Sequence, residues 1–396
     1  MKILFLTSQC STPLLPGQGP GNARILRALQ KLAECRVVIP VDTSASLLAS
    51  FLPERKLAGD IPLVETEPSG SLILHPRSYH IPGVARSLNA VLFGISVAPT
   101  FRAQVKSFRP DVILTPWAYP DGTATVALGK LWGAPVVVRA MGSDINHSAR
   151  QPGRRAQVRW ALNQAGGVVA VSQALATTMG ELGVARERIS VIPTGVDHTV
   201  FFPRDRDQAR RLLGFPQAPV VVVAARLSAE KGLMDLLQAM KSASAEIPFH
   251  LVLVGQGRQR QQLEDEVKRC GLGDRVRFDG FQMESRMPLY YSAADLVCLP
   301  SHREGWPDCL MESFACGCPV VATKVGGVPE MLALSGAGLL VPPGQPAELA
   351  LALKQGLQRA WSRDEIARAV SPYTIEDTAH RYLEVCERAV ASARRP

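Results

Sequence analysis

Two basic side chains lie five positions apart in the segment ARLSAEKG, which spans Ala225–Gly232. The segment follows an apolar run and leads into a stretch with helical spacing, so Arg226 and Lys231 flank a predicted helix start. A helix N-terminus presents unpaired N–H groups and about half a positive charge, to which a guanidinium and an ammonium group add. This combination suits a diphosphate; the alternative is a solvated pair of basic side chains beside Glu230.

Two carboxylates form the second candidate group. Glu304 and Glu312 lie in the segment SHREGWPDCLMESFACGCPVVAT. If a helix opens at Pro307 or Asp308, Glu312 lies inside it and Glu304 precedes it. The pair would either hydrolyse a glycosidic bond or accept hydrogen bonds from sugar and ribose hydroxyl groups. A third interpretation is a charge at a helix N-terminus together with an exposed helix acid.

Glycine-rich turns follow two of the predicted strands. In the first turn Gly19 would let the backbone approach an anionic group, but Asn22 stands where a dinucleotide fingerprint has its third glycine. The second turn, with Gly255 and Gly257, also lacks a third glycine. These departures disfavour a nicotinamide-dependent dehydrogenase.

The elements that must position these residues are short β-branched runs, each followed by a turn and a stretch with helical spacing, as in parallel βαβ units. In the first half, this pattern predicts strands at Lys2–Thr7, Arg36–Val41, Asp111–Thr115, Pro135–Ala140, Gly167–Val171 and Ser190–Pro193. It also predicts helices near Gly21–Ala33, Thr123–Leu131 and Ser172–Leu182. The second half predicts strands at Pro219–Ala225, His250–Val254, Arg275–Asp279, Asp295–Leu299, Pro319–Thr323 and Gly338–Val341. We therefore expect an α/β fold of two Rossmann-like, doubly wound sheets that face a central cleft.

The domain boundary is expected near residue 204, where a charged patch follows Phe202-Pro203. This gives an N-terminal domain over residues 1–203, a C-terminal domain over 204–373 and a closing helix within 374–396, where apolar residues recur at steps of three and four.

Composition excludes several classes of protein. Of the 396 residues, 46% are apolar, which suits a globular chain, and no run approaches the roughly 20 apolar residues of a membrane-spanning helix. Eight cysteines are too dilute for a disulfide scaffold, and their spacing gives no zinc site. The N-terminus lacks a signal-peptide pattern, so we expect a cytoplasmic protein.

The net charge of +9 is concentrated in the first half, where 20 basic residues face 12 acidic ones. One basic stretch joins Arg86 to the apolar residues Leu88, Val91, Leu92 and Phe93 and then to Arg102, Lys106 and Arg109, and another contains Arg150, Arg154, Arg155, Arg159 and Trp160. Both would suit an anionic membrane surface; the alternative is a solvated helix face with Trp160 packed inward. Few aromatic residues accompany these cations, which argues against a nucleic-acid partner.

The order of ARLSAEKG, LVGQG, the two glutamates and VATKVGGVPE resembles the family 4, or group 1, glycosyltransferases. The Tyr119-Pro120-Asp121-Gly122 and Gly142-Ser143-Asp144 segments look most like bacterial polysaccharide-assembly members. The resemblance implies a GT-B fold, with an acceptor domain first, a nucleotide-sugar donor domain second and the closing helix returning to the first. It implies a retaining, metal-independent hexosyltransferase with no cofactor.

By the same resemblance, Arg226 and Lys231 would bind the donor diphosphate, and Glu304 the donor sugar with help from the amides of Gly305 and Trp306. The other donor-binding positions implied are Glu312 at the ribose, Gly257, Gln282 near the base and Gly19 over the diphosphate.

One position departs from the family pattern. Met141 stands where many relatives have a His before Gly-Ser, so either Asp144 or His147 would take its place, and we name Asp144 as the alternative catalytic residue.

The expected reaction moves a sugar from a UDP- or GDP-sugar to a glycan or lipid-linked acceptor in cell-surface polysaccharide or glycolipid assembly, on the inner membrane face. Two alternatives stay open: a nucleotide-sugar epimerase of the same architecture, and a nucleotide-sugar-binding protein without turnover.

Overall fold

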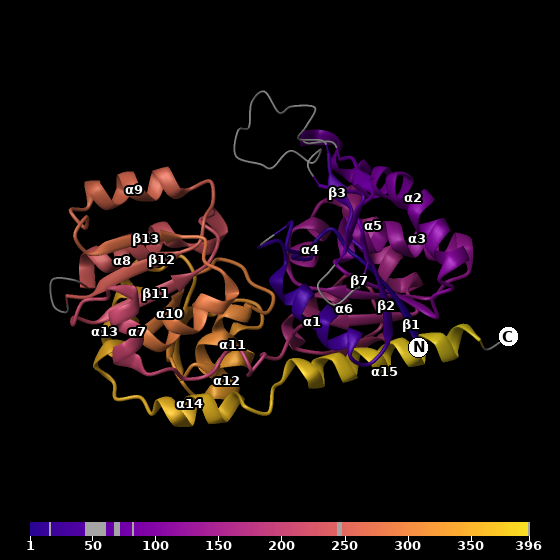
Figure 1. Ribbon diagram of the computed structural model, residues 1–396. Coiled ribbons are helices and arrows are strands. Elements are labelled where there is room, and N and C mark those ends of the chain that lie inside the picture. Colours follow the sequence, from indigo (N-terminus) through magenta and orange to yellow (C-terminus); the bar gives the residue numbers. More distant parts are fainter. Residues whose placement is uncertain (16, 44–60, 67–71, 81–82, 244–247, 395–396) are drawn as a thin grey trace. The chain divides into compact units, whose positions relative to one another are not determined.

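The computed structural model describes the chain except for residues 16, 44–60, 67–71, 81–82, 244–247 and 395–396. The chain divides into two compact units (Figure 1). The first comprises Met1–Pro193 and Ile375–Pro396, and the second comprises Thr194–Thr374. The division by contacts therefore falls ten residues before the position chosen from the sequence, because Thr194 and Val196 bond to residues of the second unit.

The first unit is built on an eight-stranded sheet in the order β10-β9-β8-β7-β1-β2-β5-β4, which is parallel except for the pairing of β4 with β5. Its strands are β1 (Lys2–Leu6), β2 (Glu34–Val38), β4 (Val64–Thr66), β5 (Leu72–Leu74), β7 (Val112–Pro116), β8 (Val136–Ala140), β9 (Gly167–Ala170) and β10 (Ile189–Val191). A separate parallel pair is formed by β3 (Val41–Asp42) and β6 (Arg77–Ser78).

Helices cover both faces of this sheet. They are α1 (Pro20–Gln30), η3 (Gly83–Leu88), α2 (Asn89–Ser107), η4 (Ala118–Gly122), α3 (Thr123–Trp132), α4 (Ser143–Asn146), η5 (Ser148–Arg150), α5 (Pro152–Gln164), α6 (Gln173–Glu181), η6 (Arg186–Arg188) and α15 (Ile375–Ala393). Figure 1 shows α15, in yellow, along the side of the sheet opposite α2 and α3.

The two faces follow from the alternation of side chains along each strand. In β8, Val137 belongs to the cluster that also contains Tyr382 and Val385 of α15. Its neighbour Val136 instead approaches Gly129 of α3 so closely that a side chain there would overlap it. Because both faces are covered there, the central strands β1, β7, β8 and β9 consist mainly of buried aliphatic residues.

The second unit has a six-stranded sheet that is parallel throughout, in the order β13-β12-β11-β14-β15-β16. Its strands are β11 (Val220–Ala224), β12 (His250–Val254), β13 (Val276–Gly280), β14 (Leu296–Leu299), β15 (Val320–Thr323) and β16 (Gly338–Val341). Its helices are α7 (Arg206–Leu213), η7 (Ala229–Lys231), α8 (Leu233–Ala243), α9 (Arg260–Arg269), η8 (Glu284–Arg286), α10 (Met287–Ala293), α11 (Asp308–Ala315), α12 (Val328–Ser335), α13 (Pro346–Gln358) and α14 (Arg363–Val370).

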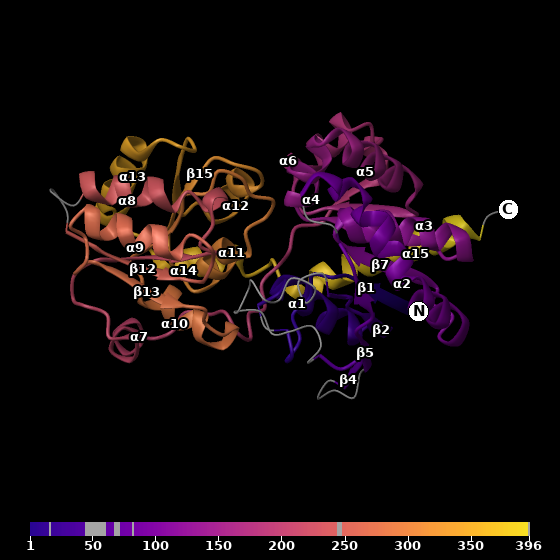
Figure 2. The ribbon, with the colours of Figure 1, turned by 90° about the horizontal axis from the view of Figure 1, so that it is seen from above.

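An apolar core lies under α8 and α13, which pack side by side (Figure 2). It combines Val221 and Val223 of β11 with Leu251 and Leu253 of β12 and Leu353 of α13. The predicted α/β class, the strands listed from the sequence and the closing helix are confirmed, with ends that differ by a few residues. In both sheets the loops after the carboxyl ends of the strands carry the candidate residues.

Candidate functional site

In the second unit, the loop after β11 is shaped by one short turn and one glycine. Residues Ala229–Lys231 form η7, Gly232 adopts a left-handed conformation with φ 63°, and α8 begins at Leu233. A Cβ on Gly232 would overlap the carbonyl oxygen of Pro300 in the loop after β14. The backbone N–H of His302 donates to the carbonyl oxygen of Glu230 at 2.8 Å. The loops after β11 and β14, 70 residues apart in sequence, therefore lie in direct contact.

This contact brings together two of the candidate residues. Lys231 Nζ lies 2.6 Å from Glu304 Oε1, and the hydroxyl group of Ser301 donates to the same oxygen at 2.6 Å. The side chains of Lys231 and Glu304 are only 17% and 9% exposed. An ammonium group and a carboxylate, each part-buried, thus stand side by side at the carboxyl end of the sheet.

The side chain of Arg226 is far more exposed than that of Lys231. It is 77% exposed, and its guanidinium lies 3.5 Å from Glu230. Burial opposes ionisation of Glu230, but the Ser228 hydroxyl and the charges of Arg226 and Lys231 hold the pKa of that carboxyl group below its ordinary value. The loop therefore holds the Arg226 guanidinium in solvent and the Lys231 ammonium group in a part-buried ion pair with Glu304.

Glu312 lies inside α11 while Glu304 precedes that helix, as the spacing predicts. It is buried, and its Oε2 accepts a hydrogen bond from Tyr291 at 2.8 Å. Burial and the Glu312 charge raise the pKa of Tyr291 well above its usual range, so this hydroxyl group stays a donor.

Gly257 lies in the loop after β12, directly against the loop that carries Arg226. A Cβ on Gly257 would overlap the carbonyl oxygen of Leu227, whose N–H donates to Gln256 at 3.1 Å. Gln282, by contrast, follows the edge strand β13, and its amide group donates to the carbonyl oxygen of Asp279 at 2.8 Å. Gly257 therefore contacts the loop that carries Arg226, whereas the side chain of Gln282 donates a hydrogen bond within its own turn.

The Gly305-Trp306 pair is held by backbone contacts. The indole N–H of Trp306 donates to Thr194 at 3.0 Å, and the carbonyl oxygen of Gly305 accepts from Gly327 at 2.9 Å. Gly326, with φ 51°, has no room for a side chain because a Cβ would overlap the carbonyl oxygen of Glu304. The sequence analysis included the VGG segment but did not predict that Gly326 packs against Glu304. The feature that could have indicated this contact is a pair of glycines just before a helix with a proline in its first turn.

In the first unit, Gly19 caps α1 with φ 68°, and a Cβ there would lie 2.5 Å from the carbonyl oxygen of Gln9. This close approach requires glycine at position 19.

Asp144 is fully buried and bonded to backbone amides. Its carboxylate accepts from Ala118 and Gly142 at 2.8 Å and from Met141 and Ile145 at 3.1 Å. Burial outweighs these bonds and raises the pKa of the Asp144 carboxyl group. The amide of Met141, the residue that departs from the expected pattern, is one of these donors.

Asp121 is a functional candidate that the sequence reasoning missed. It is fully buried in η4 and accepts hydrogen bonds from Thr7 and Ser8 at the end of β1. A Pro-Asp-Gly segment reads as an ordinary turn, so only its place directly after a predicted strand gives a signal.

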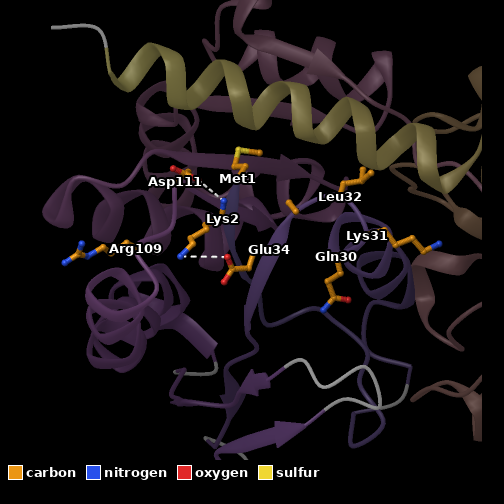
Figure 3. Close-up of a pocket in the computed structure, with 9 residues that line it drawn as sticks. Met1, Lys2, Gln30, Lys31, Leu32, Glu34, Arg109 and Asp111 are labelled. Carbon is orange, nitrogen blue, oxygen red and sulfur yellow. Dashed lines mark hydrogen bonds and ion pairs between the residues drawn. The ribbon is translucent and has the colours of Figure 1, made fainter.

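A hollow of about 760 Å³ lies at the opposite end of the first sheet (Figure 3). Figure 3 shows Lys2 between Asp111, which accepts its backbone N–H at 2.8 Å, and Glu34, 3.8 Å from its Nζ. Because this hollow lies at the amino ends of β1, β2 and β7, it is separate from the loops described above.

The two basic stretches of the first half differ in exposure. Leu88, the last residue of η3, is exposed, and the exposed residues of α2 include Val91, Ile95, Arg102 and Lys106. In α5, Arg154 is buried and lies 5.3 Å from the centre of the Tyr119 ring, so the expectation that it is a surface cation was wrong. Trp160 is 41% exposed, so it is not packed inward.

Two family models match the chain, and their ranges together span most of it. The model described as Glycosyl transferases group 1 matches residues 205–371, and the model described as Glycosyltransferase Family 4 matches residues 63–200. The chain belongs to the group 1 glycosyltransferases.

This group 1 glycosyltransferase is 35% identical over 205 residues to the 2-deoxystreptamine glucosyltransferase of Streptomyces kanamyceticus, an alignment that covers 50% of the chain and 53% of that relative. With three further curated relatives, the matched part is between 43% and 64% of the relative's length. The chain thus spans about half the length of these curated relatives.

Solved structures agree on the fold of the group 1 glycosyltransferase. Sucrose-phosphate synthase from Thermosynechococcus elongatus superposes with a TM-score of 0.80 at 22% identity, covering 99% of this chain and 100% of that one. The HepE protein of Anabaena, solved in complex with UDP, gives a TM-score of 0.72 at 23% identity, covering 97% and 99%. The fold is of the GT-B type.

Within the described ranges of the glycosyltransferase, no helix is long and apolar enough to cross a membrane. The same residues contain no cluster of three or more His, Cys, Asp or Glu side chains suited to a metal ion.

Proposed function

We propose that this chain transfers a sugar, with retention of configuration and without a metal ion, from a nucleotide diphosphate sugar to a glycan or lipid-linked acceptor. The observation that carries the proposal is the Lys231–Glu304 pair, 2.6 Å apart in the loops after β11 and β14. A diphosphate needs a fixed cation, and sugar hydroxyl groups need a fixed acceptor. Here one ion pair offers both, on the unit matched by the group 1 family model.

The chemistry follows from where charge develops. When the bond between sugar C1 and the phosphate oxygen breaks, negative charge accumulates on the leaving diphosphate. Arg226 and Lys231 stabilise that charge more in the transition state than in the ground state, which is the condition for catalysis. The acceptor oxygen bonds to C1 on the face that the phosphate leaves, and its proton passes to the phosphate. No protein nucleophile is required.

The remaining donor-binding roles are proposed on the same loops. Glu304, which is paired with the ammonium group of Lys231, accepts from the sugar hydroxyl groups, and the backbone amides of Gly305 and Trp306 lie next in sequence. Glu312 accepts from the ribose. Further along the sheet edge, Gly257 lets the backbone approach the diphosphate, and Gln282 is proposed near the base.

In the first unit, Gly19 is proposed to close over the diphosphate. Asp144 is proposed as a positioning residue, not one that touches the sugar, because its two oxygens accept four backbone N–H bonds and its side chain is fully buried.

A membrane surface is proposed as a partner of the first unit, in line with a lipid-linked acceptor. The supporting feature is α2, a 19-residue helix without an acidic residue whose outward face runs from apolar residues to cations. Such a helix lies in an anionic interface with its apolar residues inserted. The double variant Arg102→Glu/Lys106→Glu should lose binding to vesicles that contain phosphatidylserine. The control variant Arg359→Glu, which reverses a charge in the second unit, should bind them as the wild type does. Equal binding by the two variants would refute the proposal that α2 contacts the membrane.

A small cyclic polyol is the second candidate acceptor, because the Streptomyces kanamyceticus relative is named for 2-deoxystreptamine. The donor would be the same. A lipid-linked acceptor is distinguished from it by dependence of the rate on vesicles.

The deciding experiment is thermal unfolding of the purified protein against UDP, GDP, ADP, their sugar conjugates and NAD. A ligand at 100 times its Kd adds about 2.7 kcal/mol to the free energy of unfolding. We expect UDP or GDP conjugates to stabilise the wild type, and Arg226→Ala to lose that shift. Stabilisation by NAD alone would refute the proposal.

Product analysis with the stabilising donor then separates the alternatives. A transferase gives free nucleotide and a glycoside. An epimerase returns an isomerised donor, and a binding protein returns the donor unchanged.

A further inference from the structure

Asp121 is a buried carboxylate that the proposed reaction leaves without a role. It lies in η4, directly after β7, at the carboxyl end of the first sheet. Its Oδ2 accepts the backbone N–H of Ser8 at 2.5 Å and the hydroxyl group of Thr7 at 3.0 Å, and its Oδ1 accepts the hydroxyl group of Ser8 at 3.0 Å. Three donors from the end of β1 therefore converge on one carboxylate.

Ser8 begins the loop that joins β1 to α1, and further hydrogen bonds tie that loop together. The Gln18 side-chain amide donates to the carbonyl oxygen of Ser8 at 2.7 Å, and that of Asn22 donates to the carbonyl oxygen of Gln9 at 2.5 Å. Gly19 approaches Gln9 so closely that no side chain fits between them. A displacement of Ser8 is therefore passed to the backbone around Gly19.

A second carboxylate of the same unit gives a natural comparison. Asp111 immediately precedes β7 and accepts the backbone N–H of Lys2, at the other end of β1, at 2.8 Å. Both aspartates thus anchor one end of β1, but only Asp121 anchors the end that leads to Gly19.

Several charged groups on the elements packed against η4 contact residues other than Asp121. In β8 Arg139 donates to Asn22, in α4 Asp144 accepts backbone amides, and in α5 Arg154 lies over Tyr119. The charged residues of α2 and α3 are Arg102, Lys106 and Lys130, and Lys130 donates to Gln164. Burial, opposed by the bonds from Ser8 and Thr7, raises the pKa of the Asp121 carboxyl group to about 6.

We propose that Asp121 is a positioning residue that fixes the loop between β1 and α1, and with it Gly19, through its hydrogen bonds to Ser8. The carboxylate accepts all three donors. The consequence for turnover rests on the proposed function, in which Gly19 closes over the donor diphosphate.

The test compares Asp121→Ala, Asp121→Asn and the matched control Asp111→Ala by hydrogen exchange and by kinetics. In Asp121→Ala we expect the protection of amides in the β1–α1 loop to fall at least tenfold, and kcat/KM for the donor to fall about 10- to 100-fold. Asp111→Ala should leave both quantities unchanged. Asp121→Asn keeps one acceptor oxygen, so it should lose less loop protection than Asp121→Ala.

The following results would contradict the inference or separate it from the proposed function. Equal loop protection in Asp121→Ala and Asp111→Ala would overturn the inference, and so would a loss of protection in Asp121→Asn as large as that in Asp121→Ala. If Asp121→Ala fails to fold, Ser8→Ala replaces it, since it removes only the hydroxyl group; unchanged loop protection at pH 8 then counts against the inference. If the wild type turns over no nucleotide sugar, the proposed function fails, and hydrogen exchange still decides whether Asp121 positions the loop.

Discussion

Lys231→Ala and Arg226→Ala should have similar effects on turnover and different effects on stability. Each removes one fixed cation from the proposed diphosphate site, which costs on the order of 10²–10³ in kcat. Arg226 is 77% exposed, so its loss should change the free energy of unfolding by less than about 0.5 kcal/mol. Lys231→Ala leaves the carboxylate of Glu304, 9% exposed, without the ammonium group.

For the buried carboxylate, loss of a partner costs about 3–5 kcal/mol. Since Ser301 still donates to Glu304 at 2.6 Å, we expect about 2–3 kcal/mol for Lys231→Ala. The assay is urea unfolding of both variants beside donor kinetics, with Lys231→Ala/Glu304→Gln as control. The double variant should recover stability but not turnover. Equal unfolding midpoints for the two single variants, or near-normal turnover in either, would refute the reasoning.

Three further outcomes are expected. Because the pKa of Asp121 in the folded state, about 6, lies above its ordinary value of 3.8, protonation of Asp121 favours the folded state. The free energy of unfolding of the wild type, relative to that of Asp121→Asn, should therefore fall by about 3 kcal/mol as the pH rises from 3.8 to 6, and should stay constant above pH 6. Urea unfolding of both proteins at pH 4 and pH 8 measures this difference. Gly326→Ala, whose Cβ would overlap Glu304, should weaken binding of the nucleotide sugar at least tenfold, whereas Gly336→Ala, with a similar left-handed backbone but open space around it, should not, as calorimetry would show. Trp306→Phe should lose about 1 kcal/mol of stability because a buried carbonyl oxygen loses its indole donor; an unchanged urea midpoint would contradict this.

The sheets were predictable because parallel strands covered on both faces must be apolar throughout. Val220–Ala224 and His250–Val254 are visible in the sequence for that reason. The helix that contains Glu312 was predictable from Pro307 and the spacing that follows it. Local rules of this kind act within about ten residues.

Contacts between loops were not predictable in the same way. Nothing within ten residues of Lys231 indicates that its ammonium group meets Glu304, because the sheet order that joins their loops is a tertiary property. Arg154 shows the converse error: a cation in a basic run was taken as exposed, yet the ring of Tyr119 covers it. Asp121 was missed because its partners, Thr7 and Ser8, lie more than 110 residues earlier.

The helix α15 assigns residues from the far end of the sequence to the first unit. Tyr382 and Val385 pack against Val137 and Val169 in the same cluster. During synthesis these side chains leave the ribosome only after Thr194–Thr374, a delay of roughly 10–40 s at about 5–20 residues per second. By the end of that time the later unit has every strand it needs, while the apolar residues that α15 covers on the earlier sheet are still exposed to water. The part of the chain made second can therefore finish folding first.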